Sequence, residues 1–292
     1  MKGIIRLWIG LALFLVATGC SSKESSTDHG KTSVVAATVL GDLTYQDVLQ
    51  KGAVIHNLAM TDSEKIWIGT YAGLFSSSDN KLWYEVSPKL QTVDVTGWYI
   101  DPDVSTSIYL GGNNVMKQSR DGGKSWSDFK EGLPENPDIR GLIGIKKSGD
   151  LHLYAAVSGD GVYQSVDGSA WKKWMPLDQE VYAIAYHQED DRIYVATQYG
   201  LLYATDKTWE PEQLDHVEQI YSLCIDERDG AIYVATEQGV LKKEEGEWAP
   251  LVQKAPERLV VLSQGKGDYQ LVGVGESAYI YTLRNDTWTR ME

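Results

Sequence analysis

The chain has 292 residues, a formal net charge of −14 and a hydrophobic share of 42%. A surface this acidic repels nucleic acid and anionic headgroups, so we expect neither as a direct partner of the folded part. Its 10 tryptophans, 17 tyrosines and 28 glycines, beside only 3 phenylalanines, favour many short twisted strands joined by tight turns.

The first twenty residues have the pattern of a targeting signal. Lys2 and Arg6 form a positive region that precedes an apolar stretch, residues 7–16, which is too short to span a bilayer comfortably. Small residues then lead to Cys20, and this arrangement resembles the bacterial lipobox. The resemblance implies a lipoprotein signal peptide over residues 1–19 and acyl chains on Cys20. An ordinary secretion signal followed by a chance cysteine is the alternative.

Residues 20–35 are rich in serine and charged side chains, which predicts a flexible polar tether. Two or more acyl chains on Cys20 would anchor the protein firmly without bringing its folded part to the lipid. We therefore expect a lipid-anchored protein on the extracytoplasmic face of a membrane. That face is either the outer leaflet of the cytoplasmic membrane or the periplasmic side of an outer membrane.

Residues 36–54 form an N-terminal segment whose structure the sequence leaves open. The spacing from Tyr45 to Ile55 copies that of an outermost strand leading into a new blade, with Tyr45 in the place of a tryptophan. Residues 44–51 also fit a short capped helix. The segment is therefore an edge strand, a short helix or part of a seventh blade.

From residue 55 the chain repeats one pattern about every forty residues. Each copy holds a β-branched or aromatic run, then a Gly-hydrophobic step, then a turn closed by tryptophan. The runs are residues 66–70, 108–112, 153–156, 193–197, 232–236 and 270–273, and the tryptophans are Trp83, Trp126, Trp171, Trp209, Trp248 and Trp288. This period matches a four-stranded propeller blade. The sequence predicts an all-β fold, a single β-propeller of six four-stranded blades over residues 55–292, with seven blades as the alternative.

One turn carries a specific motif, with a degenerate second copy. The motif comprises Ser119, Asp121, Gly122, Gly123 and Trp126, and the copy includes Asp167 and Trp171. In such a turn Asp and Ser bond the backbone, Gly adopts positive φ and Trp packs beneath, so we predict a structural role for Asp121.

The motif resembles the Asp-box of BNR, or sialidase-type, propellers. The repeat is also similar to propellers of two-component-regulator sensors and of photosystem II assembly and stability factors. The resemblance to the photosystem II factors implies an extracytoplasmic, non-catalytic propeller. All of these resemblances leave the ligand open.

Enzyme chemistry finds little support in the residue pattern. The resemblance to sialidases would require three arginines around a substrate carboxylate, and only Arg140 and Arg258 lie in suitable positions. The five histidines show no metal-ligand spacing, so we predict no metal site, no cofactor and no catalytic residue. Once Cys20 is acylated, Cys224 has no disulfide partner, and its strand-like surroundings predict a buried hydrophobic role.

Aligning the run that opens each blade predicts one ring of side chains. Equivalent positions in a propeller lie on a circle, so one aligned column should surround a mouth of the central channel. The column consists of His56, Thr96, Arg140, Tyr182, Tyr221 and Arg258. Two fixed positive charges among aromatic edges suggest a site for a carboxylate, an acidic peptide segment or a sugar. A hydrated channel mouth with no ligand is the alternative.

The sequence thus predicts a monomeric, membrane-anchored extracytoplasmic lipoprotein. Its propeller would be a non-enzymatic binding or assembly platform for a protein or a cell-envelope component, and its membrane contact would be the lipid anchor alone. A carbohydrate-active propeller, either a glycan binder or a sialidase-like hydrolase, is the alternative.

Overall fold

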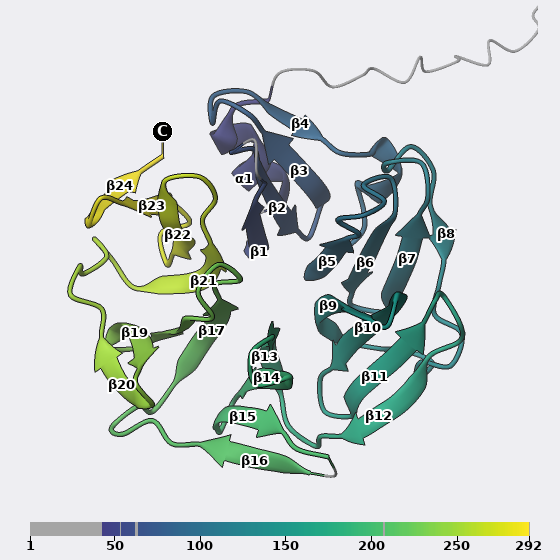
Figure 1. Ribbon diagram of the computed structural model, residues 1–292. Helices are drawn as coiled ribbons and strands as arrows, with labels where there is room; N and C mark the ends of the chain where they lie inside the picture. The colour runs from purple at the N-terminus through teal and green to yellow at the C-terminus, as the bar shows by residue number, and fades with distance from the viewer. Residues whose placement is uncertain (1–42, 53, 62–63, 207, 292) are drawn as a thin grey trace, which may run out of the picture. The chain divides into compact units, whose positions relative to one another are not determined.

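The computed structural model describes residues 43–52, 54–61, 64–206 and 208–291. Within them, six four-stranded antiparallel sheets form a ring around one axis (Figure 1). The chain is a six-bladed β-propeller. The predicted all-β class and the count of six blades are confirmed, and the alternative of seven is wrong. The predicted signal peptide, Cys20 and the tether lie outside the described residues.

Each blade is a meander whose strands run outward from the axis in chain order. The first three blades are β1 (Ile55–Met60), β2 (Ile66–Thr70), β3 (Gly73–Ser77) and β4 (Trp83–Glu85); β5 (Gly97–Ile100), β6 (Ile108–Gly112), β7 (Val115–Ser119) and β8 (Ser127–Asp128); β9 (Ile139–Lys147), β10 (Asp150–Val157), β11 (Gly161–Val166) and β12 (Lys172–Pro176). The last three are β13 (Val181–His187), β14 (Arg192–Thr197), β15 (Gly200–Ala204) and β16 (Trp209–Glu212); β17 (Ile220–Ile225), β18 (Ile232–Thr236), β19 (Gly239–Glu244) and β20 (Glu247–Pro250); β21 (Leu259–Gln264), β22 (Tyr269–Gly275), β23 (Ile280–Arg284) and β24 (Thr287–Arg290).

The up-and-down path gives the ring two distinct edges. We call the edge at which the innermost strands begin the upper edge. It holds every turn between a second and a third strand and every connection between blades. The lower edge holds the remaining turns, between first and second strands and between third and fourth strands.

Hydrophobic packing between adjacent blades forms the core. The second strand of each blade is buried on both faces, which explains its nearly unbroken apolar run, as in β6 and β18. The taper toward the axis requires small residues there. A Cβ added to Gly111 would lie 2.6 Å from a methyl carbon of Ile139 in the next blade. Each of the six blade interfaces has its own apolar cluster.

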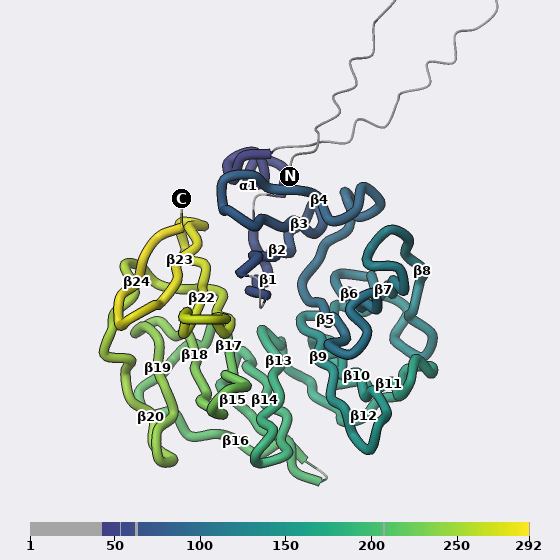
Figure 2. The backbone as a smooth tube through the Cα atoms, turned by 45° about the horizontal axis from the view of Figure 1, so that its top comes forward, coloured from purple at the N-terminus to yellow at the C-terminus, as the bar shows by residue number. Residues whose placement is uncertain are grey.

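Within the described residues the ring closes without strand exchange, because all four strands of the first and last blades come from their own part of the chain. Val261 and Val272 of the last blade pack instead with Ile66 and Phe75 of the first. A short helix, α1 (Tyr45–Gly52), joins this cluster through Val48. The termini of the described chain therefore lie near each other at one interface (Figure 2).

Tyr45 of α1 connects the first and last blades. Its ring centroid lies 5.4 Å from that of Trp83 in β4. Its hydroxyl donates a hydrogen bond of 2.5 Å to the carbonyl of Ala278, between β22 and β23. Burial raises the pKa of Tyr45, so the hydroxyl stays protonated as a donor.

Thr44 and Asp47 explain why a helix begins at this point. The Thr44 hydroxyl accepts a bond from the Asp47 N–H at 3.2 Å, and the Asp47 carboxylate accepts one from the Thr44 N–H at 2.8 Å. Just before the helix, Leu43 forms one antiparallel bridge to Trp83. Of the alternatives for residues 36–54, the described part therefore adopts the capped helix with a single strand-like contact.

We expect loss of the Tyr45 side chain to weaken ring closure. Tyr45→Phe should lower the free energy of unfolding by about 1 kcal/mol, because the Ala278 carbonyl loses its donor. Tyr45→Ala should lower it by about 2 kcal/mol, since the packing on Trp83 is lost as well. Urea denaturation measures both. Tyr199→Phe, at a side chain that is 78% exposed, is the control and should leave stability unchanged. If Tyr45→Ala unfolded at the same urea concentration as the native chain, the role of α1 in ring closure would be contradicted.

Candidate functional site

Register places four of the six ring residues at equivalent positions. In five blades the innermost strand has a β-bulge one residue after its start. The bulged residues are His56, Arg140, Tyr182, Tyr221 and, in the last blade, Val260. Arg258 therefore precedes its expected position by two residues. A shift of two keeps the same side of a strand, so sequence alternation could not reveal it.

Thr96 does not belong to an open ring. Its side chain is buried, with 4% exposure. Its hydroxyl donates to the carbonyl of Ile139 in β9 and approaches that of Gly111 at 3.2 Å. Because two backbone acceptors engage it, Thr96 joins the second and third blades and does not present a donor to a ligand.

His56 lies against a carboxylate and a tyrosine. Its Nε2 atom is 3.2 Å from Oδ1 of Asp94, and its ring meets Tyr71 edge-on at 4.2 Å between centroids. Burial lowers the pKa of His56 against the opposing effect of Asp94, and burial raises the pKa of Asp94. His56 is therefore a largely neutral imidazole near pH 7, held in a fixed orientation.

Both arginines of the predicted ring already have carboxylate partners. The Arg140 Nε donates to Asp138 at 2.9 Å, and a second guanidinium nitrogen lies 2.8 Å from the same oxygen. Arg258 pairs with Glu276, and its guanidinium lies 5.4 Å from the centroid of the Tyr221 ring. These pairs cancel the two fixed positive charges. The geometry therefore favours a neutral or cationic partner over the carboxylate that the sequence suggested.

Large side chains that contact solvent also lie at the upper edge. Tyr71 is 55% exposed in the β2–β3 turn and Tyr199 is 78% exposed in the β14–β15 turn. Val252, in the connection from β20 to β21, is 87% exposed. Acidic side chains occupy turns and connections of the same edge: Glu180, Glu218, Glu237, Glu257 and Glu276. Apolar exposure within an acidic surround is typical of a docking surface.

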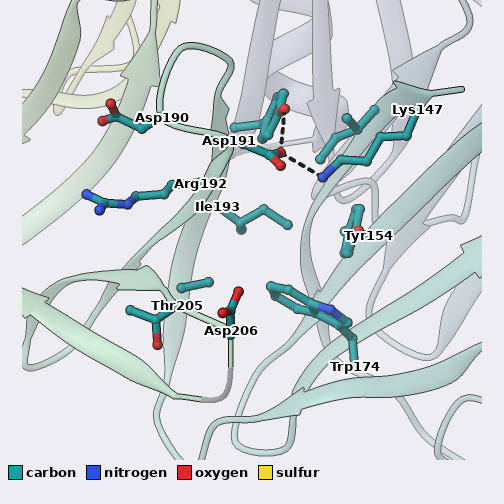
Figure 3. A pocket seen from close by; sticks show the side chains of 12 residues that line it. Lys147, Tyr154, Trp174, Asp190, Asp191, Arg192, Ile193, Thr205 and Asp206 are labelled. Carbon is teal, nitrogen blue, oxygen red and sulfur yellow. Dashed lines mark hydrogen bonds and ion pairs between the residues drawn. The ribbon is translucent and has the colours of Figure 1, made fainter.

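The lower edge carries a separate cleft between the third and fourth blades, with a volume of about 500 Å³ (Figure 3). Tyr154, Trp174 and Ile193 form its apolar part. Its polar side chains include Lys147, Asp191 and Asp206. No sequence motif predicted this cleft, because its lining comes from strands and turns of two blades that no single motif links.

One ion pair organises the cleft beside Tyr186. The Lys147 ammonium lies 2.7 Å from Asp191 and 5.8 Å from the centroid of the Tyr186 ring. The Tyr186 hydroxyl donates to the same Asp191 oxygen at 2.8 Å. Burial, followed by this contact, raises the pKa of Tyr186 to about 12. The three side chains thus form a closed charge network along one wall of the cleft.

The residues of the predicted Asp-box form a local turn. The Asp121 carboxylate accepts bonds from the Ser125 hydroxyl at 2.6 Å and the Ser125 N–H at 2.9 Å. The Ser119 hydroxyl accepts a hydrogen bond from the Gly123 N–H. Gly122 and Gly123 both have positive φ, +73° and +89°. In the degenerate copy, the Asp167 carboxylate accepts a hydrogen bond from the Leu151 N–H. The Trp171 indole N–H donates one to the Phe129 carbonyl. All these contacts lie within the fold, away from any cleft.

Other chemistry has no visible basis in the part of the chain that the structure covers. No group of three or more His, Cys, Asp or Glu side chains is placed there to hold a metal ion. Burial raises the pKa of the Cys224 thiol, which disfavours a nucleophilic thiolate. Among the described helices, none is long and apolar enough to cross a membrane.

No protein-family model matches the chain, and no curated protein matches it. Solved propellers are similar in structure. YCF48 bound to D1 peptide superposes with a TM-score of 0.59 at 13% identity, covering 82% of each chain. An ancestral GH74 enzyme and the Niastella koreensis GH74 enzyme give TM-scores of 0.57 and 0.58 at 14% identity, over 87% and 82% of this chain.

The chain spans only 40% and 47% of the two GH74 enzymes. At such identities the likeness shows the propeller fold alone. Because the similar structures include both enzymes and a peptide-bound propeller, the fold does not decide whether this chain is an enzyme.

The Asp121 turn should make stability depend on acid pH. Hydrogen bonds from Ser125 lower the pKa of Asp121 from 3.8 to about 2. Its contribution is therefore present above the ordinary pKa and is lost as pH falls through the lowered one. We expect the melting temperature of Asp121→Asn to lie below that of the native chain at neutral pH, with the gap closing toward about pH 2. Thermal melts across this range test it. The control is Asp178→Asn, in an exposed connection, whose melting temperature should follow that of the native chain at every pH. A difference in melting temperature between Asp121→Asn and the native chain that stays constant with pH would contradict the role given to Asp121.

Proposed function

We propose that this protein is an extracytoplasmic lipoprotein, anchored through Cys20, whose propeller is a non-enzymatic platform for a protein or cell-envelope component. The observation that carries the proposal is the upper edge, where Tyr71, Tyr199 and Val252 contact solvent among acidic side chains. Exposed aromatic and aliphatic residues supply the contact area of protein interfaces.

The charges of the upper edge indicate the character of the partner. Arg140 and Arg258 are paired with Asp138 and Glu276, so they add no free positive charge. The chain as a whole carries a net charge of −14. A partner that presents apolar side chains beside lysine or arginine would complement this surface, and its association would slow as salt rises.

The similar structures support a binding role without defining it. YCF48 has a TM-score of 0.59 with this chain and was solved bound to D1 peptide, which shows that a propeller of this architecture can bind a peptide. A hydrolase role would need carboxylates free to react near a substrate. On the upper edge, Asp138 and Glu276 are instead engaged by arginines, so we propose binding and no catalysis at this edge.

Photocrosslinking in native membranes tests the docking surface. Replacing Tyr71 or Tyr199 of the full chain by benzoylphenylalanine should give the same crosslinked partner, with yields that fall at high salt. The matched control is Val104, which is 49% exposed in the β5–β6 turn of the lower edge. It should not capture that partner. Equal capture from Val104, or none from either tyrosine, would exclude the upper edge as the platform.

Anchoring is tested separately. Cys20→Ser should remove the acyl chains and release the folded propeller from the membrane fraction, because anionic headgroups repel its acidic surface. Fractionation and mass determination of the mature N-terminus measure this change. Membrane retention of Cys20→Ser without acylation would show that the anchor assignment is wrong, while leaving the docking surface open to its own test.

A further inference from the structure

We infer that the cleft between the third and fourth blades is a binding site for a neutral saccharide, with the indole of Trp174 as its stacking surface and the carboxylate of Asp206 as a hydroxyl acceptor. The site is independent of the proposed docking surface, because it lies at the lower edge of the ring. Both side chains line the cleft, and Figure 3 shows them on the same side of it.

Trp174 is a tryptophan that the repeat does not require. The closing tryptophan of its blade is Trp171, whose indole N–H donates to the Phe129 carbonyl at 2.7 Å. The tryptophans Trp126, Trp209, Trp248 and Trp288 also donate to partners within the fold. The Trp174 N–H forms no such bond among the described residues, which is also true of Trp67 and of the fully buried Trp83. Unlike Trp83, however, Trp174 is only half-buried and lines the cleft.

A β-bulge directs Trp174 away from the regular strand pattern. Val162 pairs with Met175 and Tyr163 pairs with Lys173, so Trp174 is the extra residue of β12. The other five outer strand pairs keep a regular register over the described residues. Bulges of this kind reorient one side chain without altering the rest of a sheet. Edge contacts with Tyr154 at 5.2 Å and Trp209 at 6.0 Å then fix the indole.

Asp206 is the second residue that departs from the repeat. Asp79 and Asp121, at the corresponding place in other blades, accept backbone N–H bonds in their turns. In the shorter β15–β16 turn, Thr205 performs this closure, because its N–H and its hydroxyl both donate to the Thr208 carbonyl. The Asp206 carboxylate is left without a hydrogen bond or ion pair to any described residue.

The resident charges favour a neutral ligand. Two cations, Lys147 and Arg192, line the cleft with three carboxylates, those of Asp190, Asp191 and Asp206, so the lining has only a small net charge for an ionic ligand to meet. Lys147 already pairs with Asp191 and lies over the Tyr186 ring, and Arg192 lies 4.8 Å from the Tyr203 centroid. An anionic ligand would meet the unpaired Asp206. The apolar face of a pyranose ring can instead pack on the indole, while its hydroxyls donate to Asp206 and accept from Lys147.

The test uses the full-length protein in a non-glycosidic detergent. Binding is measured by tryptophan fluorescence and calorimetry with neutral β-glucan and mannan hexasaccharides, hexagalacturonate as the anionic probe and hexaglucosamine as the cationic one. We expect a neutral hexasaccharide to bind and to change the fluorescence, and the charged probes not to bind. Trp174→Ala should weaken this binding at least about tenfold. Asp206→Asn, at an exposed turn that leaves the fold unchanged, should weaken it about threefold.

Trp288→Phe is the matched control, since Trp288 occupies an outer strand two blades away. It should bind as the native chain does. Three results would overturn the inference. They are failure of both neutral hexasaccharides to bind, native affinity in both Trp174→Ala and Asp206→Asn, and tighter binding of either charged probe than of the neutral ones. None of these results bears on crosslinking at Tyr71 and Tyr199, so the two sites succeed or fail separately.

Discussion

Apolar packing between the first and last blades is the constraint on which the rest of the structure depends. No strand among the described residues crosses this interface, so closure rests there on residues such as Ile66, Phe75 and Val272, together with helix α1. Tyr45 adds a hydrogen bond that reaches from the helix to the last blade. If this contact opened, the tilt of neighbouring blades would no longer be fixed. The upper edge takes residues from several blades and the cleft from two, so both depend on how the blades are held in the ring.

Within that ring, departures from the repeat carry most of the chemical information. Trp171 and Asp121 make hydrogen bonds within the fold and serve its stability. Trp174 and Asp206 occupy a bulge and a shortened turn, where the same residue types lack such a bond among the described residues. A side chain without a structural bond is available to a ligand. A tryptophan or aspartate in a propeller is therefore best judged by whether the fold already uses it.

Ion pairs remove the positive charge that the aligned ring of side chains was expected to present. Arg140 and Arg258 would make a positive site if they were alone, but Asp138 and Glu276 pair with them. Exposed ion pairs of this kind contribute little stability, so their main effect is on the charge that a partner meets. The upper edge then presents Tyr71 and Tyr199 within an acidic surround, which is the basis for expecting a partner with basic and apolar groups.

The sequence by itself determined the six-bladed propeller, since a period of about forty residues with short double-faced strands has few other solutions. It also predicted the capped helix as one alternative, because Thr44 and Asp47 act over three residues. Tertiary structure alone decided that Thr96 bonds Ile139, that Val260 replaces Arg258 in the ring, and that the arginines are neutralised. It likewise created the cleft between blades. The physical reason is range: repeats and caps are local and visible along the chain, whereas register shifts and contacts between blades depend on residues that meet only in the folded ring.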